Sequence, residues 1–370
     1  KSRGLGDVYK RQGARNRSGL SLKPSPPRSE IAGHFVHVDD GKFHTQGRYW
    51  SNVDDVRATA KQLVKNKGKY QHLLFYAHGG LNSTKDSARR IAAMKKTFKD
   101  NGVYPYHFMY DTGILEELKD VVFRRREQME DRAGGFSDWT DQLLEWATRI
   151  PGRALWREMK SGALLPFLPG GAGAQTLKVF LNELARSSDI NLTIHIAGHS
   201  TGGFLLAGLL DALEDLAPER RLGSCSLLAP ACSIDLFRSH YFPYLVEGSD
   251  SFGVDKMQIF NLTDELEKAD QVGQVYRKSL LYLVSRAFEE EVPEKLLGMK
   301  KYAKKLTDEQ ALVELGDKLR IYYSRNEEAS ATRSTTHGGF DNDEATMNTL
   351  LETILGGAPD VPFTSETLTY

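Results

Sequence analysis

Short apolar runs alternate with amphipathic stretches along most of the chain. The runs are rich in Leu, Ile, Val, Phe and Tyr, as in buried strands, and the stretches between them carry apolar residues at helical spacing. Alternation of this kind is typical of parallel βαβ units, so it predicts an α/β fold with a doubly wound, mostly parallel sheet. The predicted strands are 72–77, 103–110, 192–197, 224–229, 256–262 and 319–323, and the clearest helices are 53–64, 85–100, 203–216 and 344–355.

The beginning of the chain differs from the rest. Residues 7–12, Asp-Val-Tyr-Lys-Arg-Gln, are what the end of a transposon used for sequencing libraries encodes, so we interpret residues 1–12 as a sequencing artefact. Residues 13–29 are rich in Arg, Ser and Pro and predict a disordered lead-in. Residues 31–45 alternate loosely around Asp39-Asp40-Gly41, which is typical of a hairpin turn.

Two insertions interrupt the alternation. The first, 112–175, combines a charged helix at 116–132, a Trp-containing helix at 139–150 and an apolar piece rich in Pro and Gly at 163–173. Insertions at strand ends commonly form lids, so we predict that the first insertion is a helical cap. Its apolar residues at 163–168 would either line an acyl pocket or pack on neighbouring helices. The resulting division is 1–30 artefact and lead-in, 31–111 core, 112–175 cap, 176–275 core, 276–318 second helical insertion and 319–370 core.

Composition excludes several classes of function. The 370 residues include 49 Lys plus Arg and 49 Asp plus Glu, and this balance argues against nucleic acid as the main partner. No apolar run reaches the length of a membrane span, so we expect no integral membrane segment and a cytoplasmic protein. Two cysteines, Cys225 and Cys232, exclude a disulfide scaffold and a Cys-rich zinc site. We expect no metal and no cofactor, and the oligomeric state stays open.

The strongest chemical signal is Gly198-His199-Ser200-Thr201-Gly202. It follows an apolar strand and precedes an apolar helix, which is the strand–turn–helix setting of a nucleophile elbow. A side chain at either glycine would collide with the neighbouring strand or helix, so the turn needs glycine at both places. The pattern predicts that the Ser200 hydroxyl lies exposed at the sheet edge as a nucleophile.

A second signal, His78-Gly79-Gly80-Leu81, follows the strand at 72–77. Small residues at this position let backbone N–H groups approach a developing negative charge. We predict an oxyanion hole in which Gly80 or Leu81 supplies one N–H donor and Thr201 supplies the other.

A nucleophilic serine needs a base, and only His240 and His337 follow Ser200 among the ten histidines. His337 lies in a polar loop between the last strand and the last helix, whereas His240 lies in an aromatic segment. We therefore predict His337 as the base.

The base needs an orienting carboxylate. Asp264 directly follows the strand at 256–262, so it is expected at the same sheet edge as the serine. Asp235, after the preceding strand, is its rival, and Glu265 and Glu267 are weaker candidates. Asp264 could instead cap the helix that follows.

The order serine, acid, histidine, with His-Gly-Gly upstream and G-x-S-x-G in the elbow, resembles the α/β-hydrolase superfamily, within it the esterase and lipase-like serine hydrolases. The resemblance extends over 72–356, interrupted by the two insertions. It implies a triad of Ser200, Asp264 and His337 that cleaves a small-molecule carboxylic ester. A serine peptidase or amidase with the same triad and a non-catalytic binding module of the same fold are the alternatives.

Overall fold

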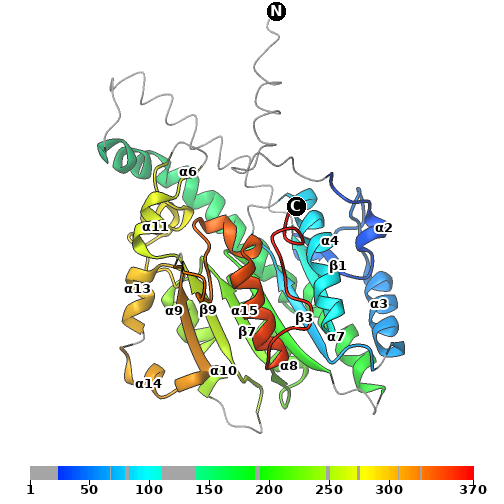
Figure 1. The fold of residues 1–370 in the computed structure, drawn as a ribbon. Coiled ribbons are helices and arrows are strands. Elements are labelled where there is room, and N and C mark those ends of the chain that lie inside the picture. Colours follow the sequence, from blue (N-terminus) through cyan, green and yellow to red (C-terminus); the bar gives the residue numbers. More distant parts are fainter. Residues whose placement is uncertain are drawn as a thin grey trace, which may run out of the picture.

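The main sheet of this protein is mostly parallel. The computed structural model describes residues 24–66, 68–79, 83–110, 138–187, 192–246, 251–272, 276–306, 308–325 and 327–370. Eight strands lie in the order β10-β9-β7-β5-β3-β4-β1-β2 (Figure 1), and every neighbouring pair is parallel except the β1–β2 hairpin. The prediction of a mixed α/β protein with a mostly parallel central sheet is therefore confirmed.

The six strands that the hydrophobic pattern predicts lie within two residues of their expected bounds. Two short strands, β6 and β8, form a separate parallel pair that the pattern did not indicate. The strands are β1 Phe35–Asp39, β2 Lys42–Phe43, β3 His72–Ala77, β4 Val103–Tyr110, β5 Thr193–His199, β6 Arg221–Leu222, β7 Ser224–Leu228, β8 Gly253–Val254, β9 Met257–Asn261 and β10 Leu319–Tyr323.

The helices connect the strands and form the two insertions. The α-helices are α2 Arg28–Ile31, α3 Val53–Lys65, α4 Thr84–Asp100, α6 Asp138–Leu164, α7 Ala172–Ala185, α8 Gly202–Leu216, α9 Ile234–His240, α10 Phe242–Val246, α11 Asp264–Ala269, α12 Leu280–Leu283, α13 Lys300–Leu306, α14 Gln310–Val313 and α15 Glu344–Leu355. Shorter turns are the 3-10 helices η1 Leu165–Phe167, η3 Gly316–Lys318 and η4 His337–Asn342, and the π-helix η2 Val284–Phe288.

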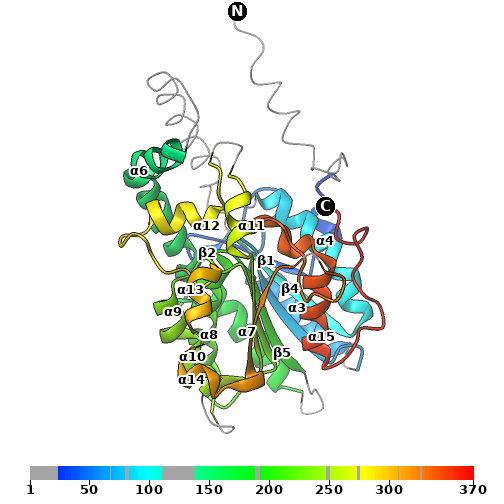
Figure 2. The ribbon, with the colours of Figure 1, turned by 60° about the vertical axis from the view of Figure 1, so that its left-hand side comes forward.

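Helices cover both faces of the sheet, as the uninterrupted apolar strands require. In β3, Leu73 and Phe75 belong to a large core shared with residues of α3, α7 and α8. Leu74 and Tyr76 point to the opposite face and pack with residues of α4 and α15. Figure 2 shows α4 and α15 on one side of the sheet and α8 on the other. A register shift of one residue in β3 would move each of these side chains to the opposite face of the sheet. The two cores together therefore fix the register of β3.

The chain changes direction across the sheet between β3 and β5. From β3 it moves outward to β4, and it then returns past β3 to form β5, β7, β9 and β10 on the other side. β3 and β5 are direct neighbours, with Ala77 opposite Gly198 at their carboxyl ends. Loops leaving such a pair run in opposite directions and open a crevice, which is where ligands bind in doubly wound sheets.

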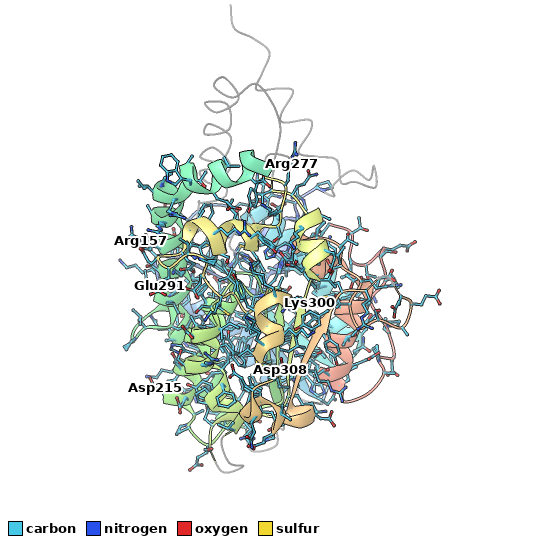
Figure 3. All side chains as sticks on the ribbon, turned by 90° about the vertical axis from the view of Figure 1, so that its left-hand side faces the viewer. Arg157, Asp215, Arg277, Glu291, Lys300 and Asp308 are labelled. Atoms are coloured by element: carbon cyan, nitrogen blue, oxygen red, sulfur yellow. The ribbon has the colours of Figure 1, made fainter. Side chains whose placement is uncertain are left out.

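The described parts of the two insertions pack on each other. Trp156 of α6 donates a hydrogen bond to the Glu289 carboxylate after η2 (2.6 Å), and Lys160 lies 2.7 Å from the same carboxylate. Nearer the start of α6, the Tyr276 hydroxyl donates to Glu145 (2.5 Å). Figure 3 views this side, where Arg157 of the first insertion and Glu291 of the second are labelled. The charged helix expected at 116–132 lies outside the described residues.

One helix of the first insertion is longer than predicted. α6 runs to Leu164 without stopping at Pro151, although an interior proline costs a helix about 3 kcal/mol. The Phe288 ring of η2 fills the space beside Gly152, where a Cβ atom would come within 2.2 Å of it. Packing of α6 against η2 on both sides of Pro151 offsets the backbone hydrogen bond that the proline removes. Because this packing joins distant segments, the local sequence does not predict that the helix continues.

Three of the apolar residues at 163–168, Ala163, Pro166 and Phe167, are buried, whereas Leu164, Leu165 and Leu168 are exposed. Phe167 is buried, lies against Phe108 of β4 (5.2 Å between ring centroids) and lies beside Gly208 in the middle of α8. A cavity of about 300 Å³ next to it is lined by residues that include Ala212 and Leu216, near the far end of α8 from Ser200. Phe167 thus packs on the core, and the use of the exposed leucines stays open.

Part of the expected disordered lead-in is ordered. Arg28 of α2 pairs with Asp55 (2.9 Å) and its guanidinium lies 3.7 Å from the centre of the Trp50 ring. The Tyr49 hydroxyl donates to the carbonyl of Pro26 (2.7 Å). Composition alone fails here because a few specific contacts anchor a polar segment.

Among the described residues, no helix combines the length and apolarity needed to cross a membrane.

Candidate active site

Ser200 occupies a strained turn between β5 and α8. Its φ of 55° lies in the left-handed region, which non-glycine residues adopt in only a few per cent of cases and which is frequent at functional sites. Backbone bonds fix this conformation, since its N–H donates to the carbonyl of Leu228 (2.8 Å) and its carbonyl accepts from Ala231 (3.0 Å) and Gly203 (3.1 Å). The end of β7 and the start of α8 therefore hold the serine from two sides.

The two glycines of the motif are explained by close packing. A Cβ on Gly202 would lie 2.5 Å from the carbonyl oxygen of Ala77 in β3, and one on Gly198 would lie 2.8 Å from Leu206 of α8. Neither glycine has a positive φ, so the requirement is for space and not for backbone freedom. Glycine at both places lets the elbow lie directly on β3.

His337 lies against the serine. Its Nε2 is 2.9 Å from the Ser200 hydroxyl oxygen, and both side chains are buried. Burial is the main reason why the pKa of His337 falls to about 3; nearby His199 lowers it further, while Asp341 raises it. The imidazole is therefore neutral at pH 7 and can accept the serine proton at Nε2.

The backbone of His337 is held at both ends. Its N–H donates to a carboxylate oxygen of Asp270 (2.8 Å), and its carbonyl accepts from Nε2 of His199 (2.8 Å). The ring nitrogen Nδ1 is buried and has no hydrogen-bond partner among the described residues. Nδ1 is the atom to which an orienting carboxylate would bind.

The structure does not bring Asp264 to this imidazole. One oxygen of Asp264 accepts from the Tyr282 hydroxyl (2.6 Å), and the other pairs with Lys268 (2.5 Å). Burial raises the pKa of Asp264, but hydrogen bonds from Lys268 and Tyr282 outweigh it and the pKa is lowered overall. Asp264 is not the helix cap either, because the Thr263 hydroxyl caps α11.

The other sequence candidates also lie elsewhere. Asp235 is exposed and lies 3.5 Å from Arg238 one turn along α9. Glu265 is exposed, and Glu267 is buried with its carboxylate bonded to the Ser279 hydroxyl. His240, the alternative base, lies 2.9 Å from Asp211.

Asp270, which sequence reasoning missed, is the carboxylate in contact with His337. It follows the last residue of α11 and is 9% exposed. One oxygen accepts from the backbone of Gln271 (2.8 Å) and the other from His337. Four acidic residues fall between 264 and 270, and the hydrophobic pattern does not distinguish which of them faces the histidine loop.

The predicted oxyanion donors Gly80 and Leu81 lie outside the described residues, but His78, Gly79 and Thr201 are described. The Tyr110 hydroxyl donates to the carbonyl of His78 (2.7 Å), so the Thr201 hydroxyl, 2.9 Å away, donates to Tyr110. His78 stacks on the Tyr110 ring and accepts from its N–H (3.3 Å), while its Nδ1 donates to Gly79 (2.8 Å). Tyr110 thus connects the end of β3 with the residue after the serine.

His78 therefore has a structural role in this arrangement. Burial lowers its pKa to about 3, so the ring is neutral and cannot supply a positive charge.

Within the described part of the chain, no group of three or more His, Cys, Asp and Glu side chains is arranged to hold a metal ion.

Comparisons with known proteins add little to this geometry. No family model matches the chain, and no curated protein matches it. The solved structures that resemble it include an uncharacterized protein from Pseudomonas aeruginosa (TM-score 0.33, 9% identity, 91% of this chain and 53% of that one) and Est1E from Butyrivibrio proteoclasticus (TM-score 0.23, 13% identity, 72% of each chain). The chain thus spans about half the length of the Pseudomonas protein. At these scores neither likeness carries an argument about function.

Proposed function

We propose that this protein is a serine hydrolase of the α/β-hydrolase type that cleaves carboxylic esters. The observation that carries the proposal is the strained Ser200, whose hydroxyl lies 2.9 Å from the neutral Nε2 of His337. This pair lies at the carboxyl ends of parallel strands, where the chain reverses direction between β3 and β5 and where ligands commonly bind in doubly wound sheets. A nucleophile and a base in hydrogen-bond contact are the minimum that covalent acyl transfer requires.

In the proposed reaction, His337 takes the proton from Ser200 as the serine oxygen attacks the ester carbonyl. The tetrahedral intermediate collapses as His337 returns the proton to the leaving alcohol, and an acyl-enzyme remains. Water then attacks the acyl-enzyme with His337 again as base. Backbone N–H groups of Thr201 and of Gly80 or Leu81 are proposed to stabilise the oxyanion, each by about 3 kcal/mol.

We propose Asp270 as the orienting acid in place of Asp264. Its carboxylate already accepts from the His337 backbone, and the buried Nδ1 of that histidine needs an acceptor for its proton. A carboxylate bonded to Nδ1 would fix the tautomer that leaves Nε2 free to act as base. Asp264, paired with Lys268 and Tyr282, would have to break both contacts to serve.

The test is a panel of p-nitrophenyl esters of rising acyl length beside peptide anilides, with fluorophosphonate labelling. The wild type should hydrolyse esters and react with the fluorophosphonate at Ser200, and Ser200→Ala should lose about 10⁴-fold or more in turnover while remaining folded. Turnover of anilides but not esters would make it an amidase. If the folded wild type hydrolyses neither esters nor anilides and does not react with the fluorophosphonate, the remaining interpretation is a non-catalytic binding module.

A matched pair of variants separates the two acids. Asp270→Asn should lower kcat by about 10³- to 10⁴-fold, because the wrong histidine tautomer then prevails. Asp264→Asn should change kcat by less than about tenfold, since it removes one partly exposed ion pair. The reverse pattern would restore the assignment of Asp264.

A further inference from the structure

A fully buried ion pair lies behind the His337 loop. Asp341 of η4 has no solvent exposure, and its carboxylate is 2.6 Å from Nε of Arg90 in α4. The same carboxylate accepts from the hydroxyls of Tyr76 (3.3 Å) and Tyr370 (3.0 Å). Side chains from β3, α4 and residue 370 thus converge on the helix that begins at His337.

His199 lies between this carboxylate and the candidate base. Its Nε2 lies 2.8 Å from the carbonyl oxygen of His337, which can only accept, so Nε2 carries the proton. Its Nδ1, which then carries no proton, lies 3.6 Å from the Asp341 carboxylate and makes no hydrogen bond within the described part of the chain, and the His199 and His337 rings are 5.4 Å apart. We call Arg90, Asp341 and His199 the support cluster.

Burying the ion pair of the support cluster carries a large desolvation free energy, so stability alone does not explain it. Two buried charges lose their hydration, and well-packed apolar residues of similar volume often serve stability equally well. Hydrogen bonds and ion pairs fix the orientation of side chains more narrowly than apolar packing does. The cluster can therefore hold its residues in one defined orientation. Asp341 and His337 lie in the same short helix, so fixing the carboxylate also fixes the start of η4.

We propose that His199 and Asp341 are positioning residues, which hold the backbone of His337 so that its Nε2 stays in contact with Ser200. This inference rests on the proposed function, because the residue being positioned is the base of that reaction. A misplacement of about 1 Å at a reacting group can cost about 100-fold in rate. Loss of the His199 contact should therefore lower kcat and leave KM almost unchanged.

The first test compares His199→Met with His199→Gln. Glutamine can place an N–H donor close to the position of the imidazole Nε2, whereas methionine fills a similar volume without a donor. We expect His199→Met to lower kcat by about 100-fold with KM within about threefold, and His199→Gln to recover kcat to within about tenfold of the wild type. Equal kcat values for the Met variant and the wild type, or for the Met and Gln variants, would overturn the proposal.

The matched control is His195→Met. His195 lies on the same strand and is equally buried, but it bonds with Ser224 (2.8 Å) and His72 (3.0 Å) near the other end of β5. We expect kcat within about threefold of the wild type for this variant. A loss as large as that of His199→Met would show a general effect of removing a buried histidine and would overturn the proposal.

Asp341 is tested without breaking the ion pair, since Asp341→Asn would leave Arg90 buried and unpaired and could prevent folding. Tyr370→Phe removes the hydroxyl that lies 3.0 Å from the Asp341 carboxylate, 3.0 Å from Nε of Arg90 and 2.5 Å from Oδ1 of Asn342, while the two charges of the ion pair stay in place. We expect kcat to fall about three- to tenfold at constant KM. An unchanged kcat would remove Asp341 from the proposal.

Nitrogen-15 NMR of the histidine rings provides a readout that does not depend on turnover. His199 should be neutral with its proton on Nε2, and His199→Met should shift the Nε2 signal of His337 as the contact with Ser200 loosens. An inert wild type would reject the proposed function, whereas an unchanged His337 signal in His199→Met would reject the positioning role alone.

Discussion

Replacing Glu267 by glutamine should change how stability depends on pH. Glu267 is 1% exposed, one carboxylate oxygen accepts from the Ser279 hydroxyl, and the other has no partner among the described residues. Burial is the main reason why its pKa rises to about 8, with the charges of Asp270 and Asp264 adding to the effect and Ser279 opposing it. The folded protein therefore keeps a proton on Glu267 that the unfolded chain releases near pH 4.5.

The magnitude follows from proton linkage. Between pH 4.5 and 8 the folded state binds one more proton at this site than the unfolded state, so the free energy of unfolding decreases as pH rises. Each unit of pKa difference corresponds to about 1.4 kcal/mol, so the full loss from this group is about 5 kcal/mol. Glutamine does not titrate, and the loss should be absent from Glu267→Gln.

The assay is equilibrium urea unfolding of the wild type and Glu267→Gln at intervals from pH 5 to 9. At pH 5 the variant should be up to about 2 kcal/mol less stable, because its extra amide N–H is buried without an acceptor. Its stability relative to the wild type should then increase by about 4 kcal/mol between pH 5 and 9, with the increase levelling off above pH 8. The control is Glu265→Gln, at an exposed site, whose difference from the wild type should stay constant over this range. Parallel curves for Glu267→Gln and the wild type would refute the reasoning.

Three further predictions follow from single contacts. Gly202→Ala should cost at least about 100-fold in kcat, because the new methyl group would lie 2.5 Å from a β3 carbonyl oxygen, whereas Gly162→Ala, in open space on α6, should keep kcat and gain up to about 1 kcal/mol in urea unfolding; equal kcat values would contradict this. Tyr110→Phe removes the hydroxyl between the ends of β3 and β5, so kcat should fall about tenfold in the ester assay; an unchanged kcat would argue against that link. Trp156→Phe keeps a ring but removes the donor to a buried carboxylate, and thermal unfolding should show a loss of about 1–3 kcal/mol, with an unchanged Tm as the opposing result.

The main sheet could be predicted from sequence because each central strand is a short apolar run bounded by polar residues. The strand at 72–77 is an example, since both of its faces are buried and its bounds coincide with the structure. The outer strand β1 was harder, because only the Asp40-Gly41 turn revealed it, and nothing local indicates that it pairs in parallel with β4. The pairing of two strands far apart in sequence depends on the packing of helices between them.

The candidate site also has one part that local sequence predicts and another that depends on tertiary packing. The elbow around Ser200 can be recognised from five consecutive residues and their flanks, although bonds to Leu228 and Ala231 also hold its conformation. The contact of Asp270 with His337 depends on how α11 is oriented, and that orientation is set by tertiary packing. The ion pair of Arg90 with Asp341 joins α4 to η4 and has no signature in either segment.

The contact between the two insertions has a consequence for exchanging parts of this protein with those of relatives. Trp156 and Lys160 come from one insertion and Glu289 from the other, more than 100 residues apart in the chain. Transplanting one insertion alone would leave this carboxylate in a foreign setting, where an unpaired buried charge is strongly destabilising. Chimeras that replace both segments together should therefore fold more often than chimeras that replace either one, and the two segments should be inherited as a unit.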